Sequence, residues 1–461
     1  MANLAAVSPW LDGADAAAPP LEGERRADVA IVGAGLTGLS TALSLRREGM
    51  DVVVLEAERA GFGASGRNAG HVTPAIGKDL PTLVRLYGRE RSGALVRLAH
   101  AAIAHVETLI ERHRIDCDYE PVGNLIAAVH PRQHASLDRA AAAAAGFGLP
   151  GRILERDELE RRGLPRFVTR GWFEPHGGLL DPGRYVRGLR RAALAAGAAL
   201  FEATPVTAIE AGSPVALRTP RGRVRASQVV LATNAWTPDL GRLRGCATRL
   251  HVQLLRTEPL DAAARDALGW AGREGIYTAH EVLESWRWTP DGRILGGSKV
   301  VRAGFGQRWL EDVDRRVADR LEQTLRQRFP ELRGVPVERH WGGPIFTSLD
   351  FLPWIGRRGN VLHALAFAGH GIPLGSYAGE MIADLLSGRS GAGSALTSRR
   401  AVPTPPEPLR WLVFHAIHGW LSGIDRRVDA RVPVPRAQGG RLESRPTRSE
   451  PKASEGGPPP S

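Results

Sequence analysis

Three glycines spaced as Gly-x-Gly-x-x-Gly are the residues of this chain best suited to hold a phosphorylated ligand: Gly33, Gly35 and Gly38. In this pattern the first glycine permits a tight turn, the second lets the backbone approach a diphosphate, and the third lets helix and strand pack closely. Leu36 and Thr37 would open the following helix, whose free N–H groups and dipole favour negative charge. The motif therefore predicts that this segment binds a dinucleotide.

The segments around these glycines have the order that such a site needs. Apolar residues at 29–32 and 52–55 predict two strands, with a helix between them that ends before Gly49. Glu56 follows the second strand, where a carboxylate can accept hydrogen bonds from a ribose diol. Strand, helix, strand and acid in this order favour a nucleotide-binding fold over an ordinary glycine-rich turn.

The chain has 461 residues, which exceeds the size at which a single core keeps growing, so two domains are expected. Its formal net charge is +12, from 61 basic and 49 acidic residues. The excess is arginine, since Lys78, Lys299 and Lys452 are the only lysines, and the arginines are scattered. A nucleic-acid-binding face would need them gathered with aromatic residues, so no nucleic-acid partner is expected.

No apolar run reaches the roughly 20 residues that span a bilayer, and the first residues lack the basic start of a signal peptide. Cys117 and Cys246 belong to no Cys-x-x-Cys pair, which argues against a disulfide framework or a structural zinc site. His100 and His105 lie five positions apart, which is off the helical spacing for sharing a metal ion. We therefore expect a cytoplasmic protein with no transmembrane segment and no metal.

Four separated pieces of the sequence resemble one family. The glycine motif, the loop Gly63-Ala-Ser-Gly-Arg-Asn68, the turn 180–184 and the segment 341–386 are together similar to the D-amino-acid oxidase superfamily of FAD-dependent oxidoreductases. Within this superfamily the chain is most similar to the branch with glycine oxidase, sarcosine oxidase and γ-glutamylputrescine oxidase, and the loop resembles the γ-glutamylputrescine oxidase type. The resemblance implies an α/β fold, in which a discontinuous Rossmann-like FAD-binding domain carries an inserted α+β substrate domain on a mainly antiparallel sheet.

The resemblance also implies a division of the chain. The expected ranges are 1–27 for an N-terminal arm, 28–80, 150–248 and 335–395 for the FAD-binding domain, 81–149 and 249–334 for the substrate domain, and 396–461 for a tail that is disordered after about 432.

FAD contacts are implied along the whole cofactor. The expected residues are Gly33, Gly35, Leu36, Thr37, Gly38 and Glu56 at the diphosphate and ribose; Val206, Ala232, Thr233 and Trp236 at the adenine half; and Ser65, Gly66, Arg67, Asn68, Gly70, His71, Gly342, Gly369, His370, Gly371, Ile372, Pro373 and Leu374 at the flavin.

The family's usual chemistry is oxidation of a C–N bond of a small amine or amino acid, giving an imine that water hydrolyses. Hydride transfer leaves negative charge on the flavin pyrimidine, and the helix that starts near Gly371 would stabilise it. The alternatives are an oxidoreductase acting on an aminomethyl group of tRNA, a flavoprotein subunit of a larger hetero-oligomeric complex, and an NAD(P)-dependent dehydrogenase. Only the last is disfavoured by the flavin-side turn.

Three residues are candidates for direct roles at the reacting centre. His370 and His71 lie at expected flavin positions, and each has a structural role as its alternative. Arg287 is a candidate ligand for a substrate carboxylate, because its planar fork matches two oxygens. A surface salt bridge is the alternative for Arg287.

Two departures from the family pattern affect the expected chemistry. Sarcosine oxidases carry a lysine that assists oxygen reduction, where this chain has Pro373; Lys78 or Lys299 would have to replace it. The electron acceptor is therefore oxygen or another carrier. Pro344 stands where some relatives bond FAD to a cysteine, so non-covalent FAD is expected. The apolar segment 409–421 could dock on the protein or lie on a membrane surface.

Overall fold

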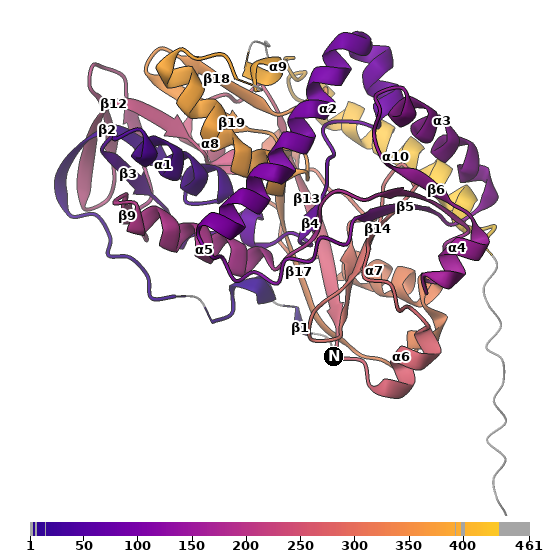
Figure 1. Cartoon of the computed structure of the whole chain (residues 1–461). Coiled ribbons are helices and arrows are strands. Elements are labelled where there is room, and N and C mark those ends of the chain that lie inside the picture. The colour runs from indigo at the N-terminus through magenta and orange to yellow at the C-terminus, as the bar shows by residue number, and fades with distance from the viewer. Residues whose placement is uncertain (1–2, 5–6, 14, 392, 398–401, 433–461) are drawn as a thin grey trace, which may run out of the picture.

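The structure is a computed structural model that describes residues 3–4, 7–13, 15–391, 393–397 and 402–432. Two large sheets lie beside each other, with helices packed around them (Figure 1). The tail after residue 432, for which disorder was expected, lies outside the described residues.

The first sheet contains the expected nucleotide-binding unit. The strands β2 and β3 pair in parallel, and α1 connects them through the glycine turn. The strand order is β10-β11-β12-β2-β3-β9, with β19 paired to β12 and β18 to β19. The strands are β2 (Gly23–Val32), β3 (Val52–Leu55), β9 (Ala199–Phe201), β10 (Ala208–Glu210), β11 (Val215–Arg218), β12 (Gly222–Leu231), β18 (Trp354–Arg358) and β19 (Val361–Leu365).

Strand β2 shows why this sheet is buried on both faces. Val29 and Ile31 pack into a core with α1 and the neighbouring helices, whereas Ala30 and Val32 pack into a second core on the opposite face. Successive side chains of a strand point to opposite faces, so a central strand covered on both sides reads as a continuous apolar run.

The second sheet is mainly antiparallel, as expected. Its order is β1-β17-β13-β16-β15-β14-β5-β7-β6, and only the β1–β17 and β14–β5 pairs are parallel. The strands are β1 (Asn3–Leu4), β5 (Asn124–Ala128), β6 (Arg152–Leu154), β7 (Arg170–Glu174), β13 (Thr248–Thr257), β14 (Gly275–Thr278), β15 (Ser285–Trp288), β16 (Ile294–Gly297) and β17 (Val337–Thr347). A short ribbon, β4 (His71–Val72) with β8 (Gly178–Leu179), lies apart from both sheets.

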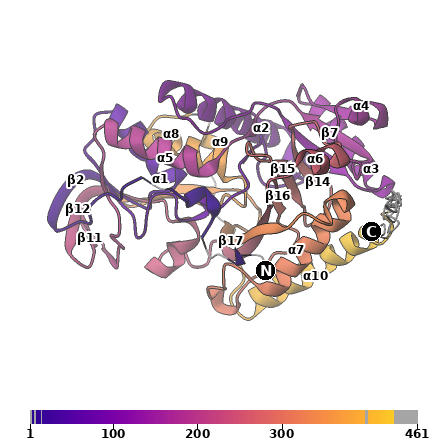
Figure 2. The ribbon, with the colours of Figure 1, turned by 90° about the horizontal axis from the view of Figure 1, so that it is seen from below.

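The helices divide between the two sheets. Buried residues of α1, α2, α5 and α8 share one core with the parallel sheet, while α7 packs with the antiparallel sheet. The helices are α1 (Leu36–Arg47), α2 (Leu80–Arg112), α3 (His134–Ala145), α4 (Arg156–Arg161), α5 (Pro182–Ala195), α6 (Ala262–Leu268), α7 (Arg315–Arg328), α8 (Gly371–Ser387), α9 (Ser394–Thr397) and α10 (Leu409–Asp429). Figure 2 shows α10 running toward the end of α7.

Three segments pack with a different sheet from the one that the expected domain ranges assign to them. Strands β6 and β7, which follow residue 150, and β17, which follows residue 335, pair in the antiparallel sheet. The apolar side of α2, which was assigned to the substrate domain, packs in the core of the parallel sheet. Edge and connecting segments therefore cross between the two parts, and the division itself stays a prediction.

Among the described residues, α2 is the helix that is long and apolar enough to cross a membrane by length and composition. Its chain departs from helical geometry at Gly88, where φ is 76°. Leu95, Leu98 and Val106 on α2 are buried in the core that it shares with α1 and α8. This internal packing accounts for its apolar composition.

Candidate active site

One large cavity lies where the two sheets meet. Its volume is about 1820 Å³, whereas a pocket for one drug-sized ligand is about 300–1,000 Å³. The cavity therefore has room for an extended cofactor together with a small substrate.

Most of the residues expected at the cofactor line this cavity. They are Gly33, Gly35, Leu36, Thr37, Glu56, Ser65, Arg67, Asn68, His71, Val206, Ala232, Thr233, Trp236, Gly342, Gly369, His370, Gly371 and Ile372. Gly38, Gly66, Gly70, Pro373 and Leu374 are not among the lining residues.

The glycine turn requires glycine for three different reasons. Gly33 has a φ of +102°, a conformation that side chains disfavour. A Cβ on Gly35 would lie 2.7 Å from Ser65 Oγ, and this side of the turn faces the cavity. A Cβ on Gly38 would lie 1.9 Å from the carbonyl oxygen of Gly33, so glycine is needed for α1 to pack against the turn. The geometry fits the close approach of a diphosphate.

Glu56 is held at the end of β3 by the backbone. Its Oε2 accepts a hydrogen bond from the N–H of Ala34 at 2.7 Å, and its Oε1 accepts one from Glu58 at 3.0 Å. Burial raises the pKa of this carboxyl above its usual range, while the two backbone hydrogen bonds act in the opposite direction. Each oxygen keeps acceptor capacity toward the cavity, as a ribose diol requires.

The loop 61–71 is fixed by side chains from distant segments. The Trp10 indole donates to the carbonyl oxygen of Asn68 at 3.0 Å, and the Trp341 indole donates to that of Arg67 at 2.9 Å. The Asn68 amide donates to two carbonyls within the loop, and Gly70 N–H donates to Asn68 Oδ1 at 2.8 Å. A backbone held this firmly can present its groups to a planar ring without reorganisation.

The turn before α8 has unusual backbone geometry. Ala366, Ala368 and Gly369 have φ values of +64°, +52° and +91°. Such conformations cluster at ligand-binding sites, where the surrounding structure holds them. They turn the chain so that α8 begins at the cavity, with His370 at its N-cap. Burial lowers the pKa of His370 to about 4, so its imidazole is neutral at neutral pH.

The surface salt bridge that was the alternative for Arg287 does not form, while its role as a ligand for a substrate carboxylate stays a prediction. Its side chain is fully buried, which contradicts a surface salt bridge, and it is not among the residues that line the cavity. Its Nη1 donates to the carbonyl oxygens of Leu180 at 2.7 Å and Ala69 at 3.0 Å, and more weakly to Gly70. The guanidinium therefore clamps the loop 61–71 to the turn before α5.

His71 belongs to the wall at which the two parts of the molecule meet. Its ring centroid lies 4.5 Å from that of Tyr277, and both side chains line the cavity. Burial and the nearby Arg287 guanidinium lower the pKa of His71 to about 3. Its ring nitrogens are buried without a hydrogen-bond partner. A neutral, packed ring is the result, and no ion pair forms at this position.

The face of the antiparallel sheet that meets the cavity follows from strand register. Tyr277 lies opposite Ile126 on one side and opposite Ser285 on the other. Partners in register point to the same face, and all three residues line the cavity. This row of uncharged side chains was not found from the sequence, because it draws single residues from three strands.

A further part of the wall comes from α10, which the sequence predicts only as a docked or membrane-bound segment. The helix contributes six lining residues at helical spacing: Arg410, Val413, Phe414, Ile417, His418 and Leu421. The apolar spacing within 409–421 was visible, but nothing in the sequence indicated which surface it would meet.

The two lysines considered as partners for oxygen have different surroundings. Lys299 is buried and pairs with Glu284 at 2.8 Å and Asp429 at 2.9 Å, away from the cavity lining. Lys78 lines the cavity, with its Nζ 4.0 Å from the centre of the Phe351 ring. Lys78 is therefore the better placed of the two.

Comparisons with known proteins agree with this geometry. A family model described as FAD dependent oxidoreductase matches residues 28–385. The gamma-glutamylputrescine oxidoreductase of Escherichia coli (strain K12) is 32% identical over 387 residues, which cover 82% of this chain and 88% of that protein. A probable oxidoreductase, OrdL, of Rhizobium meliloti (strain 1021) is 29% identical over 423 residues, which cover 88% and 94%.

Solved structures show the same fold. The glycine oxidase from Geobacillus kaustophilus matches with a TM-score of 0.68 and 23% identity, over 82% of this chain and 99% of that one. The iminodiacetate oxidase from Chelativorans sp. BNC1 matches with a TM-score of 0.65 and 21% identity, over 82% and 100%.

Proposed function

This chain belongs to the family of FAD-dependent oxidoreductases, and on that premise we propose that it oxidises the C–N bond of a small amine or amino acid to an imine. The relative with 32% identity is named for such a substrate, γ-glutamylputrescine. When bound along the glycine turn and the start of α8, FAD would supply the two-electron acceptor for the hydride on the carbon beside the nitrogen. Water then hydrolyses the imine to a carbonyl compound and an amine or ammonia.

The observation that carries this proposal is the start of α8 at the cavity that Tyr277 and Ser285 also line. Backbone N–H groups of the first helical turn, with no side-chain cap from His370, favour negative charge where the reaction develops it. The cavity is thus lined by the glycine turn and Glu56, which suit a nucleotide, and by the start of α8, which favours an anion.

In this proposal the protein's own residues position the amine and do not act as acid or base. Removal of hydride needs the neutral amine held in line, so a neutral wall serves better than a charged one. His370 and His71 stay uncharged at neutral pH because burial lowers the pKa of His370 to about 4 and, with Arg287, that of His71 to about 3. Both histidines are proposed as neutral contacts in this role.

We also propose that FAD is held without a covalent bond to cysteine. Cys117 and Cys246 are not among the cavity-lining residues, and burial raises the pKa of Cys117 to about 12. A thiol with so high a pKa is a poor nucleophile at neutral pH. Denaturation with acid should release all of the yellow colour into the supernatant.

The decisive experiment is anaerobic reduction of the bound flavin. Purified protein is mixed under nitrogen with γ-glutamylputrescine, putrescine, glycine and sarcosine, and the visible absorbance of the flavin is followed. We expect bleaching by at least one of these amines, and reoxidation by air or by an added quinone then identifies the acceptor. A yellow protein that no primary or secondary amine bleaches would contradict the proposal.

A further inference from the structure

Helix α10 lies outside the part of the chain that matches the family, yet it completes the cavity. The match ends at residue 385, whereas α10 spans Leu409–Asp429. One side of the helix lines the cavity through Val413, Phe414 and Ile417, among others. Whatever binds beside this helix therefore meets residues that the family model does not cover.

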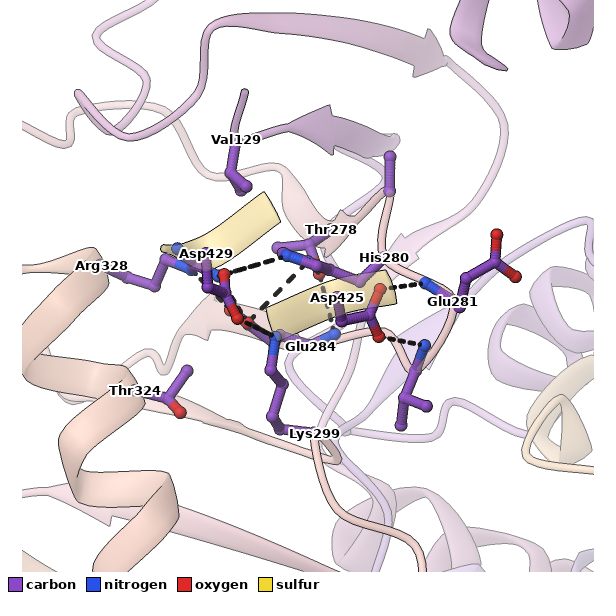
Figure 3. Close-up of polar contacts among 12 residues, drawn as sticks. Val129, Thr278, His280, Glu281, Glu284, Lys299, Thr324, Arg328, Asp425 and Asp429 are labelled. Carbon is purple, nitrogen blue, oxygen red and sulfur yellow. Dashed lines mark hydrogen bonds and ion pairs between the residues drawn. The ribbon is translucent and has the colours of Figure 1, made fainter. Parts of the chain in front are cut away.

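The far end of α10 is fixed by a buried cluster of charges (Figure 3). Asp429 pairs with Arg328 at 2.5 Å and with Lys299 at 2.9 Å, and Glu284 pairs with the same two cations at 2.8 Å. Two carboxylates and two cations leave the cluster neutral overall. The cations hold the pKa of Glu284 and Asp429 well below the usual range, against the effect of burial.

A metal ion is a poor alternative occupant of this cluster. His280, Glu284 and Asp429 place ligand atoms within 4.8 Å of one another. Both carboxylates, however, already pair with Lys299 and Arg328, so a divalent ion would have to displace two cations. The cluster therefore attaches the C-terminal end of α10 to the antiparallel sheet and α7; we call it the fastening of α10.

Asp425 links this fastening to the cavity wall. Its two carboxylate oxygens accept hydrogen bonds from the N–H groups of Glu281 and Val282, each at 2.9 Å. Glu281 and Val282 line the cavity themselves, between β14 and β15. The helix thus positions the neighbouring loop as well as contributing its own side chains.

The cavity side of α10 is mainly apolar. Arg410 on this side is paired with Glu407 at 2.8 Å, and burial is the main cause that lowers the pKa of His418. Val413, Phe414, Ile417 and Leu421 make up the remainder. Among these six side chains, His418 alone has a buried ring nitrogen, Nε2, without a hydrogen-bond partner, and none offers a free charge to a charged substituent. An aliphatic chain, in contrast, would meet four apolar side chains.

We infer that α10 is the specificity wall of the active site and selects amines that carry an apolar chain of several carbons. This inference rests on the proposed function for the amine, while the wall itself is an observation of the structure. Phe414 and Ile417 are the specificity-determining residues, and Asp425 is a positioning residue.

The test measures binding separately from turnover. Amines whose carbon beside the nitrogen bears no hydrogen cannot be oxidised, so a short and a long tert-alkylamine are titrated into the FAD-loaded protein by calorimetry. In the wild type we expect the long amine to bind about tenfold or more tightly than the short one, since each methylene in an apolar pocket contributes strongly. Phe414→Ala should remove most of this difference and leave the short amine unaffected.

Trp420→Ala is the matched control, because Trp420 lies on the same helix with 66% of its surface exposed and does not line the cavity. It should keep the wild-type preference. Asp425→Asn should lower the preference by a smaller factor than Phe414→Ala.

The outcomes separate the two proposals. Flavin bleaching by oxidisable amines without any chain-length preference in binding would overturn the specificity wall and leave the proposed function standing. Suppose instead that Phe414→Ala removes a chain-length preference in binding but that no amine bleaches the flavin. This result would overturn the proposed function and leave the specificity wall standing. Equal preference in Phe414→Ala and wild type would also overturn the inference.

Discussion

The two ends of the cavity differ in the groups that line them: backbone groups of one turn at one end, and side chains from several elements at the other. At the nucleotide end, consecutive backbone groups of one turn, Gly33 to Gly38, meet a single carboxylate from the next strand. At the end where we propose that the substrate binds, single side chains come from β5, β14, β15 and α10. The glycine turn depends on local conformation, so a short stretch of sequence is enough to predict it. The other end depends on tertiary packing, and it can change without altering the turn.

The largest expected effect tests the local turn. Gly38→Ala puts a Cβ 1.9 Å from the Gly33 carbonyl oxygen, and only a shift of α1 against β2 can relieve the overlap. We expect a loss of about 3 kcal/mol or more in the free energy of unfolding, together with protein that purifies without flavin. Gly334→Ala, where a Cβ would meet no atom within 4 Å, is the control and should stay yellow.

The second prediction asks whether Arg287 belongs to the substrate end. Arg287→Met removes the guanidinium donor from the carbonyl oxygens of Ala69, Leu180 and Trp288, while the Gly70 carbonyl keeps the N–H of Leu180. The expected cost is about 3 kcal/mol in the free energy of unfolding, measured with urea. Arg273→Met, which breaks a partly exposed pair with Glu120, should cost less than about 1 kcal/mol. A raised KM for an amino acid with unchanged stability would instead make Arg287 a substrate ligand.

The third prediction concerns pH. The pKa of His71 is about 3 in the folded protein, and about 6.5 in the unfolded chain. The unfolded state therefore takes up a proton first, so this contribution to stability is complete above pH 6.5 and is lost as the pH falls toward 3. At pH 5 the loss is about 2 kcal/mol. His71→Phe should flatten the decline in unfolding free energy between pH 7 and pH 5, whereas the exposed His415→Phe should not.

The smallest effect concerns the ribose contact. Glu56→Gln removes the negative charge and one of the two backbone hydrogen bonds that hold this side chain. We expect the dissociation constant of FAD to rise about tenfold, measured by titrating apoprotein with flavin and following fluorescence. The exposed Glu22→Gln serves as control. Unchanged FAD affinity in Glu56→Gln would remove this residue from the cofactor site.

The sequence predicted the fold because its main signals are local. The strand–helix–strand unit at 28–56 has the expected elements, and the antiparallel second sheet agrees with the resemblance. The domain boundaries were harder to predict, because β17 and α2 pack across the expected division between the FAD-binding and substrate domains. Such pairing depends on contacts between residues hundreds of positions apart, which periodicity cannot reveal.

The candidate site shows the same limit. Gly35, Ser65 and His370 belong to sequence motifs, and all three line the cavity. These motifs could be recognised because a required backbone conformation restricts the residue types around them. Arg287 was assigned by its chemical type, but the residue that a guanidinium meets is decided by packing, and here it meets carbonyl oxygens. Tyr277 and Phe414 carry no signal that separates them from core residues.

Helix α10 has a consequence for how this chain could diversify. The helix is attached at three neighbouring residues: Asp425 binds two backbone N–H groups, Val428 packs in the core, and Asp429 joins the charged cluster. A foreign helix at this place would need the same three residues. Under the proposed role of α10, a chimaera that keeps them and exchanges only the cavity-facing residues would alter the choice of amine without loosening the helix.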